Sequence, residues 1–408
     1  FHKGYIMSAT GDILDLTGTF TWTDAAEIGD YYKQGYVLTK NLTVQGQGAD
    51  TTIIQAASRD NSANRRVFTV VSGATVTFQN LTVRYGRVFG YQSDGGGIRN
   101  DGITTIDDCE IYNNRSASDS GGGISNRHTL TVTNSSIYNN VAYYMGGGIV
   151  NSFYVDPSGY LTVTNSTIAY NQQTTGIAYT EGGGIHIRKG SATITNSTIA
   201  YNTATGVAGL GIDDSDGTIT IKNTIIANNI KRNSDYYVDF GFRASGQGNV
   251  VDNGNNIVGV SQNYTWSGTG DWSDVDRDGT FLLNNSITTG SLNLNSYLAF
   301  NGNTNKTKTL SVSTGSVAID YGTTGTNGAV SVPTADQRDF IRESTPDIGS
   351  FEFLSAPDDT TDPVISDISS TPTSTTAVIT WTTDEATSSQ IIYDPNQIRS
   401  TASDVSNV

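Results

Sequence analysis

Three aspartates gather in one short stretch of the chain and are the first candidates for chemistry. Asp213, Asp214 and Asp216 form the sequence IDDSDG directly after an apolar GLGI. Hydrolysis of a glycosidic bond needs two carboxylates at a set separation. Elimination from an acidic sugar needs Ca²⁺ and a base, and Arg188 and Lys189 follow an equivalent GGGI. The aspartates are therefore the candidate catalytic residues, although a polar surface loop is the simpler explanation.

A second acidic stretch has the residue types that calcium prefers. Asp274, Asp276 and Asp278 occur in DVDRDG, followed by Gly279. Oxygen ligands at alternate positions and a glycine for the turn suit Ca²⁺. The twelfth position of an EF-hand loop needs a glutamate, and Asn285 stands there. The stretch thus predicts a calcium site that is not a complete EF-hand, with an acidic, solvated turn as the alternative.

The histidines and the cysteine give no further motif. His2, His128 and His186 are the only histidines, and their positions form no metal-binding spacing. Cys109 is the only cysteine, so an intrachain disulfide is excluded. We expect Cys109 to be a small packed residue, because serine replaces it in the equivalent position of other repeats.

Aromatic residues are plentiful between the repeats, and the chain has 21 tyrosines. An exposed tyrosine can stack on a sugar or anchor a protein interface, and it can also simply cover a solenoid. The loop aromatics that we consider as a group are Tyr143, Tyr144, Phe153, Tyr154 and Tyr179.

The chain repeats itself on a cycle of about 25–35 residues, which is typical of a solenoid. Each unit has a first anchor, found at Asn80, Asp108, Asn134, Asn165, Asn196 and Asn223. Six residues later comes a second asparagine, found at Asn114, Asn140, Asn171, Asn202 and Asn229. A glycine-rich segment precedes the next unit, at 95–98, 121–124, 146–149, 182–185 and 209–212.

These repeats predict the fold. Apolar and polar residues alternate before each first anchor, as in LTVT at 161–164, which is typical of a strand with one buried face. The links inside a unit are short, so each strand can pair only with its equivalent in neighbouring units. The sequence therefore predicts an all-β chain whose body is a right-handed parallel β-helix. Stacking should place asparagine on asparagine and form two ladders of side-chain amides along the axis.

We expect five parts along the chain. They are an N-terminal cap with the first coils (1–75), regular coils (76–230), irregular last coils with a C-terminal cap (231–354), a linker (355–365) and a partial fibronectin III-like segment (366–408).

Composition limits the partners. The net charge of −16 argues against nucleic acid and against anionic lipid, because both need a basic surface. No stretch is long and apolar enough to span a membrane. We therefore expect a secreted, extracellular or cell-surface protein, and the N-terminus FHKGYIMSAT does not resemble a signal peptide.

The GGGI and NSTI signatures resemble the β-helix repeats of bacterial surface proteins, including the polymorphic outer-membrane type. The ending ADQRDFIRESTPDIGSFEF at 335–353 is similar to the "choice-of-anchor Q" family of secreted β-helix proteins. The resemblance implies surface display and no defined reaction. From the residue types, we expect an ion-paired cap over the last coil, formed by Asp336, Arg338, Arg342, Asp347 and Glu352.

The C-terminal segment resembles the first strands of a fibronectin type III or immunoglobulin-like sandwich. It reads as three strands, and Val378, Trp381 and Ile391 are its candidate assembly residues. A sandwich needs about seven strands, so either the protein continues or neighbouring molecules supply strands.

Together these features favour an extracellular structural or adhesive protein. It would be a rigid β-helix that displays loops and self-associates or attaches to a cell surface. The alternative is a β-helix that binds or degrades polysaccharide, although motifs expected of polygalacturonases or pectate lyases are absent. Ca²⁺ is the only cofactor that the sequence suggests.

Overall fold

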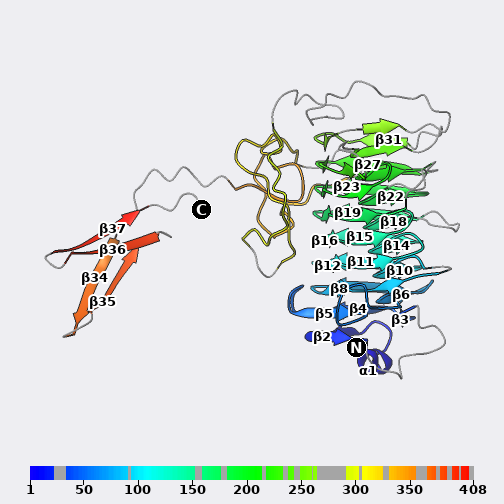
Figure 1. Cartoon of the computed structure of the whole chain (residues 1–408), viewed down its shortest axis with the longest axis horizontal. Coiled ribbons are helices and arrows are strands. Elements are labelled where there is room, and N and C mark those ends of the chain that lie inside the picture. The colour runs from blue at the N-terminus through cyan, green and yellow to red at the C-terminus, as the bar shows by residue number, and fades with distance from the viewer. Residues whose placement is uncertain are drawn as a thin grey trace. The chain divides into compact units, whose positions relative to one another are not determined.

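The body of the chain is a parallel β-helix in which successive coils add strands to three long sheets and one short sheet. The stack runs from α1 at one end to β31 near the other (Figure 1). The computed structural model describes residues 1–22, 34–90, 93–151, 159–175, 182–213, 217–232, 238–242, 249–259, 261–263, 291–302, 306–324, 330–354, 365–373, 377–383, 388–394 and 397–403. The chain forms two compact units, Phe1–Phe353 and Leu354–Val408.

Every strand of the four sheets pairs in parallel with its equivalent one coil away. Sheet A contains β1 (Ile13–Asp15), β4 (Leu42–Gln45), β7 (Thr75–Gln79), β11 (Ile103–Asp107), β15 (Thr129–Thr133), β19 (Tyr160–Thr164), β23 (Ser191–Thr195), β27 (Thr218–Lys222) and β31 (Asn249–Asp252). Sheet B contains β2 (Gly18–Thr21), β5 (Thr52–Gln55), β8 (Thr82–Arg84), β12 (Glu110–Tyr112), β16 (Ser136–Tyr138), β20 (Thr167–Ala169), β24 (Thr198–Ala200), β28 (Ile225–Ala227) and β32 (Ile257–Val258).

The GGGI segments lead into sheet C, and a short sheet D follows the second asparagine. Sheet C contains β3 (Tyr36–Leu38), β6 (Phe68–Val70), β10 (Ile98–Asn100), β14 (Ile124–Asn126), β18 (Ile149–Asn151), β22 (Ile185–Ile187), β26 (Leu210–Ile212), β30 (Phe240–Phe242) and β33 (Ser261–Asn263). Sheet D contains β9 (Arg87–Val88), β13 (Arg115–Ser116), β17 (Val141–Ala142), β21 (Gln172–Gln173), β25 (Thr203–Ala204) and β29 (Ile230–Lys231).

Alternation along each strand separates the core from the surface. In β15, Leu130 and Val132 are fully buried, whereas the three threonines between and beside them are partly exposed. The register places aliphatic residues of successive coils opposite one another, so Val132 pairs with Ile106 on one side and Val163 on the other. One continuous apolar core therefore fills the β-helix, and the prediction of a parallel β-helix is confirmed.

The glycine triplets are required by close approach of the backbone. A Cβ atom on Gly96 would lie 2.4 Å from the carbonyl oxygen of Gly122, and one on Gly122 would lie 2.4 Å from that of Gly147. The first glycine of each triplet also has a positive φ, for example 68° at Gly121. Both conditions exclude larger residues, so GGGI marks where the chain bends tightly against the next coil.

A short helix, α1 (His2–Met7), covers the first coil. Phe1 and Tyr5 pack on the core, and the Phe1 ring lies 4.4 Å from that of Tyr36. Within the described ranges, no helix has the length and apolar character needed to cross a membrane.

The last part of the first unit has little regular structure. The described residues of 291–302, 306–324 and 330–353, which we call the lateral segment, lie along one side of the stacked coils (Figure 1). Side-chain bonds join this segment to coils from Asp108 to Asn255. The expected cap over the last coil is therefore wrong in its position, because the described residues of the segment cover the side of the β-helix.

The second unit contains four described strands rather than the three that we expected. They form two antiparallel hairpins, β34 (Ile365–Pro372) with β35 (Ala377–Thr383), and β36 (Ser388–Asp394) with β37 (Gln397–Ser403). The first hairpin has a register shift between Ser366 and Ser369.

Candidate functional site

The second asparagine series forms a continuous buried ladder. Asn114, Asn140, Asn171 and Asn202 each donate from Nδ2 to the Oδ1 of the next member at 2.8–3.0 Å, ending at Asn229. The backbone N–H of each also donates to the same Oδ1 atom. The ladder ends on Asp239, whose Oδ1 accepts from Asn229 at 2.8 Å. Each of these amides is used within the fold, so the series is structural.

The first series behaves differently from the expected amide ladder. Asn134, Asn165, Asn196 and Asn223 all have φ between 46° and 49°, so they serve as left-handed corners. Only one amide bond joins neighbours, from Asn165 to Asn134 at 3.3 Å. Asn165 and Asn223 instead bond to the lateral segment, through Ala335 and Thr323. The corner geometry turns these amides away from the axis, which is why the predicted ladder is incomplete.

A third series was missed in the sequence. Asn100 donates to Asn126 at 2.8 Å, and Asn126 donates to Asn151 at 2.6 Å. The signal was present, because each of these asparagines lies two residues after the isoleucine of GGGI. Cys109 stands at the head of a serine column, since its N–H donates to Ser135 Oγ at 3.0 Å. Burial raises the pKa of its thiol, as expected for a packed residue.

The outer surface of sheet A has a column of a different kind, which we call the threonine ladder. Its seven members are in register on seven successive strands: Thr43, Thr77, Thr105, Thr131, Thr162, Thr193 and Thr220. All seven are partly exposed. Among the described residues, none of their hydroxyls has a hydrogen-bond partner within the chain. With strands about 4.8 Å apart, the ladder is about 29 Å long.

The columns beside the threonine ladder are mixed. One contains Tyr160 and Ile103, which are 58% and 43% exposed and therefore stand above the sheet. The other contains, in order, Asp107, Thr133, Thr164, Thr195 and Lys222, of which the last two are buried. The surface thus combines regularly spaced hydroxyl and methyl groups with one prominent aromatic ring.

The candidate catalytic aspartates are only partly described. Asp213 follows β26, is buried, and has its Oδ1 atom 3.4 Å from Nε2 of the fully buried His186 on the preceding coil. Asp214 and Asp216 lie outside the described residues. Arg188 and Lys189 follow β22, and the Arg188 N–H donates to Asn151 O. The sequence did not indicate that Asp213 and His186 are neighbours, because their separation depends on loop lengths.

The candidate calcium ligands Asp274, Asp276 and Asp278 also lie outside the described residues, so the calcium site stays a prediction. In the part of the chain that is described, no group of three or more His, Cys, Asp or Glu side chains could hold an ion.

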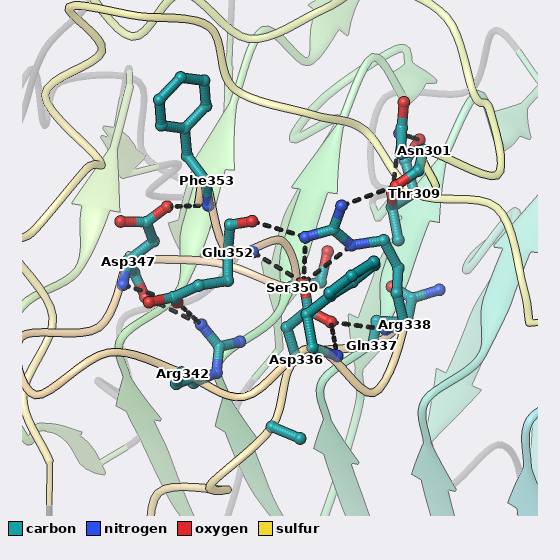
Figure 2. A network of polar contacts seen from close by, with 12 residues as sticks. Asn301, Thr309, Asp336, Gln337, Arg338, Arg342, Asp347, Ser350, Glu352 and Phe353 are labelled. Carbon is teal, nitrogen blue, oxygen red and sulfur yellow. Dashed lines mark hydrogen bonds and ion pairs between the residues drawn. The ribbon is translucent and has the colours of Figure 1, made fainter. Parts of the chain in front are cut away.

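The charged residues of the predicted cap form a buried network within the lateral segment (Figure 2). Arg338 donates from Nε to Asp336 at 2.8 Å, and Arg342 pairs with Glu352 at 2.8 Å. Asp347 accepts hydrogen bonds from the N–H groups of Asp320 and Phe353. Burial raises the pKa of Asp347 to about 7 and raises that of Glu352, while Arg342 lowers both.

This network attaches the lateral segment to sheet B. Gln337 bonds to Ser136 and Thr167, and Ser350 bonds to Thr198, each at 2.7–3.2 Å. Arg342 also donates to Asn165 at 3.2 Å. The residues are buried and satisfied mainly by one another, which supports a structural role.

The regularly placed tyrosines also hold this segment. Tyr170 and Tyr201 stack at 5.4 Å, and their hydroxyls donate to carbonyl oxygens of Ser296 and Leu294. Tyr138 donates to Glu110, which pairs with Lys308 at 3.1 Å. Of the loop aromatics, Tyr143 and Tyr144 are in ring contact at 4.8 Å, and Tyr143 is 36% exposed. Phe153, Tyr154 and Tyr179 lie outside the described residues.

The candidate assembly residues fall in the second unit. Val378 lies in β35 and is 63% exposed, and Trp381 is partly exposed in the same strand. Ile391 lies in β36 and pairs in register with Ser400, while its side chain lies outside the described part.

Comparisons with known proteins add little beyond the fold. No protein-family model matches the chain, so the likeness to the choice-of-anchor Q family stays a prediction. A search of curated proteins found no match. Among solved structures, the chain is similar to "Crystal structure of pectate lyase Pel9A", with a TM-score of 0.46 and 16% identity over 86% of this chain and 90% of that one. At this level the likeness carries no argument about activity.

Proposed function

We propose that this protein is an extracellular adhesive β-helix that binds an extended, neutral polysaccharide through the threonine ladder. The observation that carries this proposal is the row of seven aligned, partly exposed hydroxyls without partners in the described chain. Threonine favours strands for its shape alone, so its presence is not enough. The contrast with the fully used asparagine amides on the same coils is what favours a ligand.

A repeating polymer suits such a surface. The hydroxyls recur at the strand spacing of about 4.8 Å, so a chain lying along the axis meets the same groups many times. Many weak contacts then add up to useful affinity. Tyr160, which is 58% exposed at the edge of the ladder, offers a ring on which a sugar can stack.

The test is binding to insoluble neutral β-glucan and chitin. The triple variant Thr131→Val, Thr162→Val and Thr193→Val removes three central hydroxyls and keeps the side-chain shape. We expect it to lose most of the binding. Thr203→Val, on the outer surface of sheet D, is the matched control and should bind like the unmodified protein. Equal binding by the triple variant would contradict the proposal.

Degradation of polysaccharide is a second candidate function, favoured by the approach of His186 to Asp213 at 3.4 Å. A carboxylate held beside an imidazole can act in acid/base catalysis, and Asp213 is the member of the pair that reaches the surface, because His186 is fully buried. Release of reducing or unsaturated sugars from polysaccharides, abolished in His186→Gln and in Asp213→Asn, would support it. Product release that survives both substitutions would place any active site elsewhere.

Surface attachment and self-association belong to the same proposal. Exposed Val378 on a two-stranded hairpin offers an apolar surface for another strand or another copy. Electron microscopy of the concentrated protein tests this, and discrete monomers at high concentration would argue against assembly.

A further inference from the structure

Two arginines of the same charge lie side by side on the outer surface of sheet D. Arg87 in β9 pairs in register with Arg115 in β13, and both side chains are partly exposed. Neighbouring strands of a sheet lie about 4.8 Å apart, and like charges placed directly opposite one another are destabilising. An anion between the two side chains would remove this repulsion.

The chain does not supply that anion within the described residues. In the described part of the chain, neither arginine has a carboxylate within 4.0 Å, although the protein has a net charge of −16. Arg99, Arg127, Arg338 and Arg342, by contrast, are each ion-paired. The Nε atom of Arg87 is buried and has no hydrogen-bond partner. A charged donor without a partner in a strongly acidic protein indicates that its acceptor comes from elsewhere.

One aromatic ring borders the arginine pair, and two more lie beside the neighbouring Arg84. The guanidinium of Arg87 lies 5.4 Å from the ring centre of Phe89, which is 42% exposed. One corner away, Arg84 lies 4.6 Å from the ring of Tyr85 and donates to the hydroxyl of Tyr112 at 2.7 Å. The surface therefore combines positive charge with rings that can stack on a flat ligand.

We infer that Arg87 and Arg115 bind the anionic groups of an acidic polysaccharide, with a carboxylate or sulfate between the two guanidinium groups. Arginine suits both anions, because its planar fork can donate two parallel hydrogen bonds. Phe89 would stack on an adjacent sugar ring. This site lies on a different sheet from the threonine ladder and does not depend on the function proposed for that ladder.

Charge density favours a polysaccharide over a nucleic acid. Duplex DNA carries one negative charge per about 1.7 Å, and an acidic protein repels such a ligand strongly. A polyuronate carries at most one negative charge per sugar. Two arginines can therefore neutralise the charges that lie nearest to them, although the protein as a whole is negative. The exposed Phe89 also suits the apolar face of a sugar.

Titration calorimetry with the full chain tests the inference. The ligands are an oligouronate, its methyl ester, which lacks only the charge, and a sulfated oligosaccharide of equal length. We expect binding to one or both charged ligands and none to the ester. The double variant Arg87→Gln and Arg115→Gln should weaken binding about tenfold or more. A matched loss of two charges at exposed sites, Lys3→Gln with Arg59→Gln, should change it less than about twofold.

Two further measurements keep the outcome clear. Raising salt from about 50 to about 200 mM should weaken the unmodified protein more than the double variant. The thermal unfolding of the double variant should match that of the parent, since relief of repulsion offsets lost packing. Equal binding by parent and double variant overturns the inference. Competition by a DNA oligonucleotide as strong as by the oligouronate overturns the assignment to polysaccharide.

Discussion

Two ladders run along the same coils and differ in whether their polar groups have hydrogen-bond partners within the described chain. Asn171 uses its amide four times, bonding to Asn140, Asn202 and Ile137 within the fold. Thr162, in the same coil, has a hydroxyl with no partner in the described chain. Both residues repeat with equal regularity, so repetition alone does not distinguish a structural column from a binding surface. What distinguishes them is whether the polar groups are already satisfied.

The largest loss of stability should come from Asn171→Ala. The change would remove the Oδ1 acceptor of the buried Asn140 N–H and the Nδ2 donor to the Ile137 carbonyl. Asn140 Nδ2 and Asn202 Oδ1 would each lose one of two partners. A buried group left without a partner costs about 1–3 kcal/mol, and the loss of the shared bonds adds to this, so we expect a loss of about 2–4 kcal/mol in the free energy of unfolding. Chemical denaturation measures it. A loss below about 1 kcal/mol would show that the ladder is not the structural column.

Stability should also depend on pH through buried carboxyls, because asparagine amides do not titrate. Burial raises the pKa of Asp119 on the coils and of Asp347 in the lateral segment. The pKa of Asp347 rises to about 7, well above its unfolded value. Between about pH 4 and pH 7 the folded state keeps a proton that the unfolded state releases, so this group lowers stability as pH rises through that window.

Asp347→Asn should remove that part of the pH dependence. We expect the difference in stability between pH 5 and pH 7.5 to be smaller in the variant than in the parent, measured by denaturation at both values. An unchanged slope in the variant would show that Asp347 is ionised in the folded protein throughout.

Two asparagines occupy corners of the same type but differ in their hydrogen-bond partners. Asn165 bonds to Ala335 and accepts from Arg342, whereas the buried Asn196 amide has no partner in the described chain. Both have a φ of 46°, which glycine adopts freely. We expect Asn165→Gly to cost about 1–3 kcal/mol and Asn196→Gly to cost about zero. Equal costs in denaturation would mean that only the corner geometry matters.

Substitutions in the threonine ladder should have little effect on stability. Thr162→Val keeps the shape and removes a hydroxyl that the fold does not use, so we expect a change within about 0.5 kcal/mol. A clear loss of stability would show that the hydroxyl belongs to the fold and would weaken its role in binding.

The sequence predicted the fold well because the repeat is local. Residue types that recur at a regular interval predict three features. These are the stacked isoleucines of the core, the second asparagine ladder and the bends at the GGGI segments. The surface column at Thr162 was also visible as alternation, but whether its hydroxyl is used depends on neighbouring coils. That information is three-dimensional, and no periodicity contains it.

Contacts between distant parts of the chain were beyond sequence reasoning. The sequence predicts that Asp336 and Arg342 belong to one ion-paired group. It does not predict that Arg342 lies beside Asn165, because that contact joins residues 177 positions apart in the chain. The approach of His186 to Asp213 depends on the lengths of two intervening loops. The like-charged Arg87 and Arg115 emerged only from the register of two very short strands.

The lateral segment changes how the coils of this solenoid should unfold. Coils that touch only their neighbours can peel away one at a time from either end. Here Lys306 pairs with Asp108, 198 residues earlier, and Gly349 donates to Asn223. The lateral segment bonds to the coils between those points from one side, so we expect these coils to unfold together and slowly. In the proposed surface role, a force applied to one end would then have to unfold several coils at once.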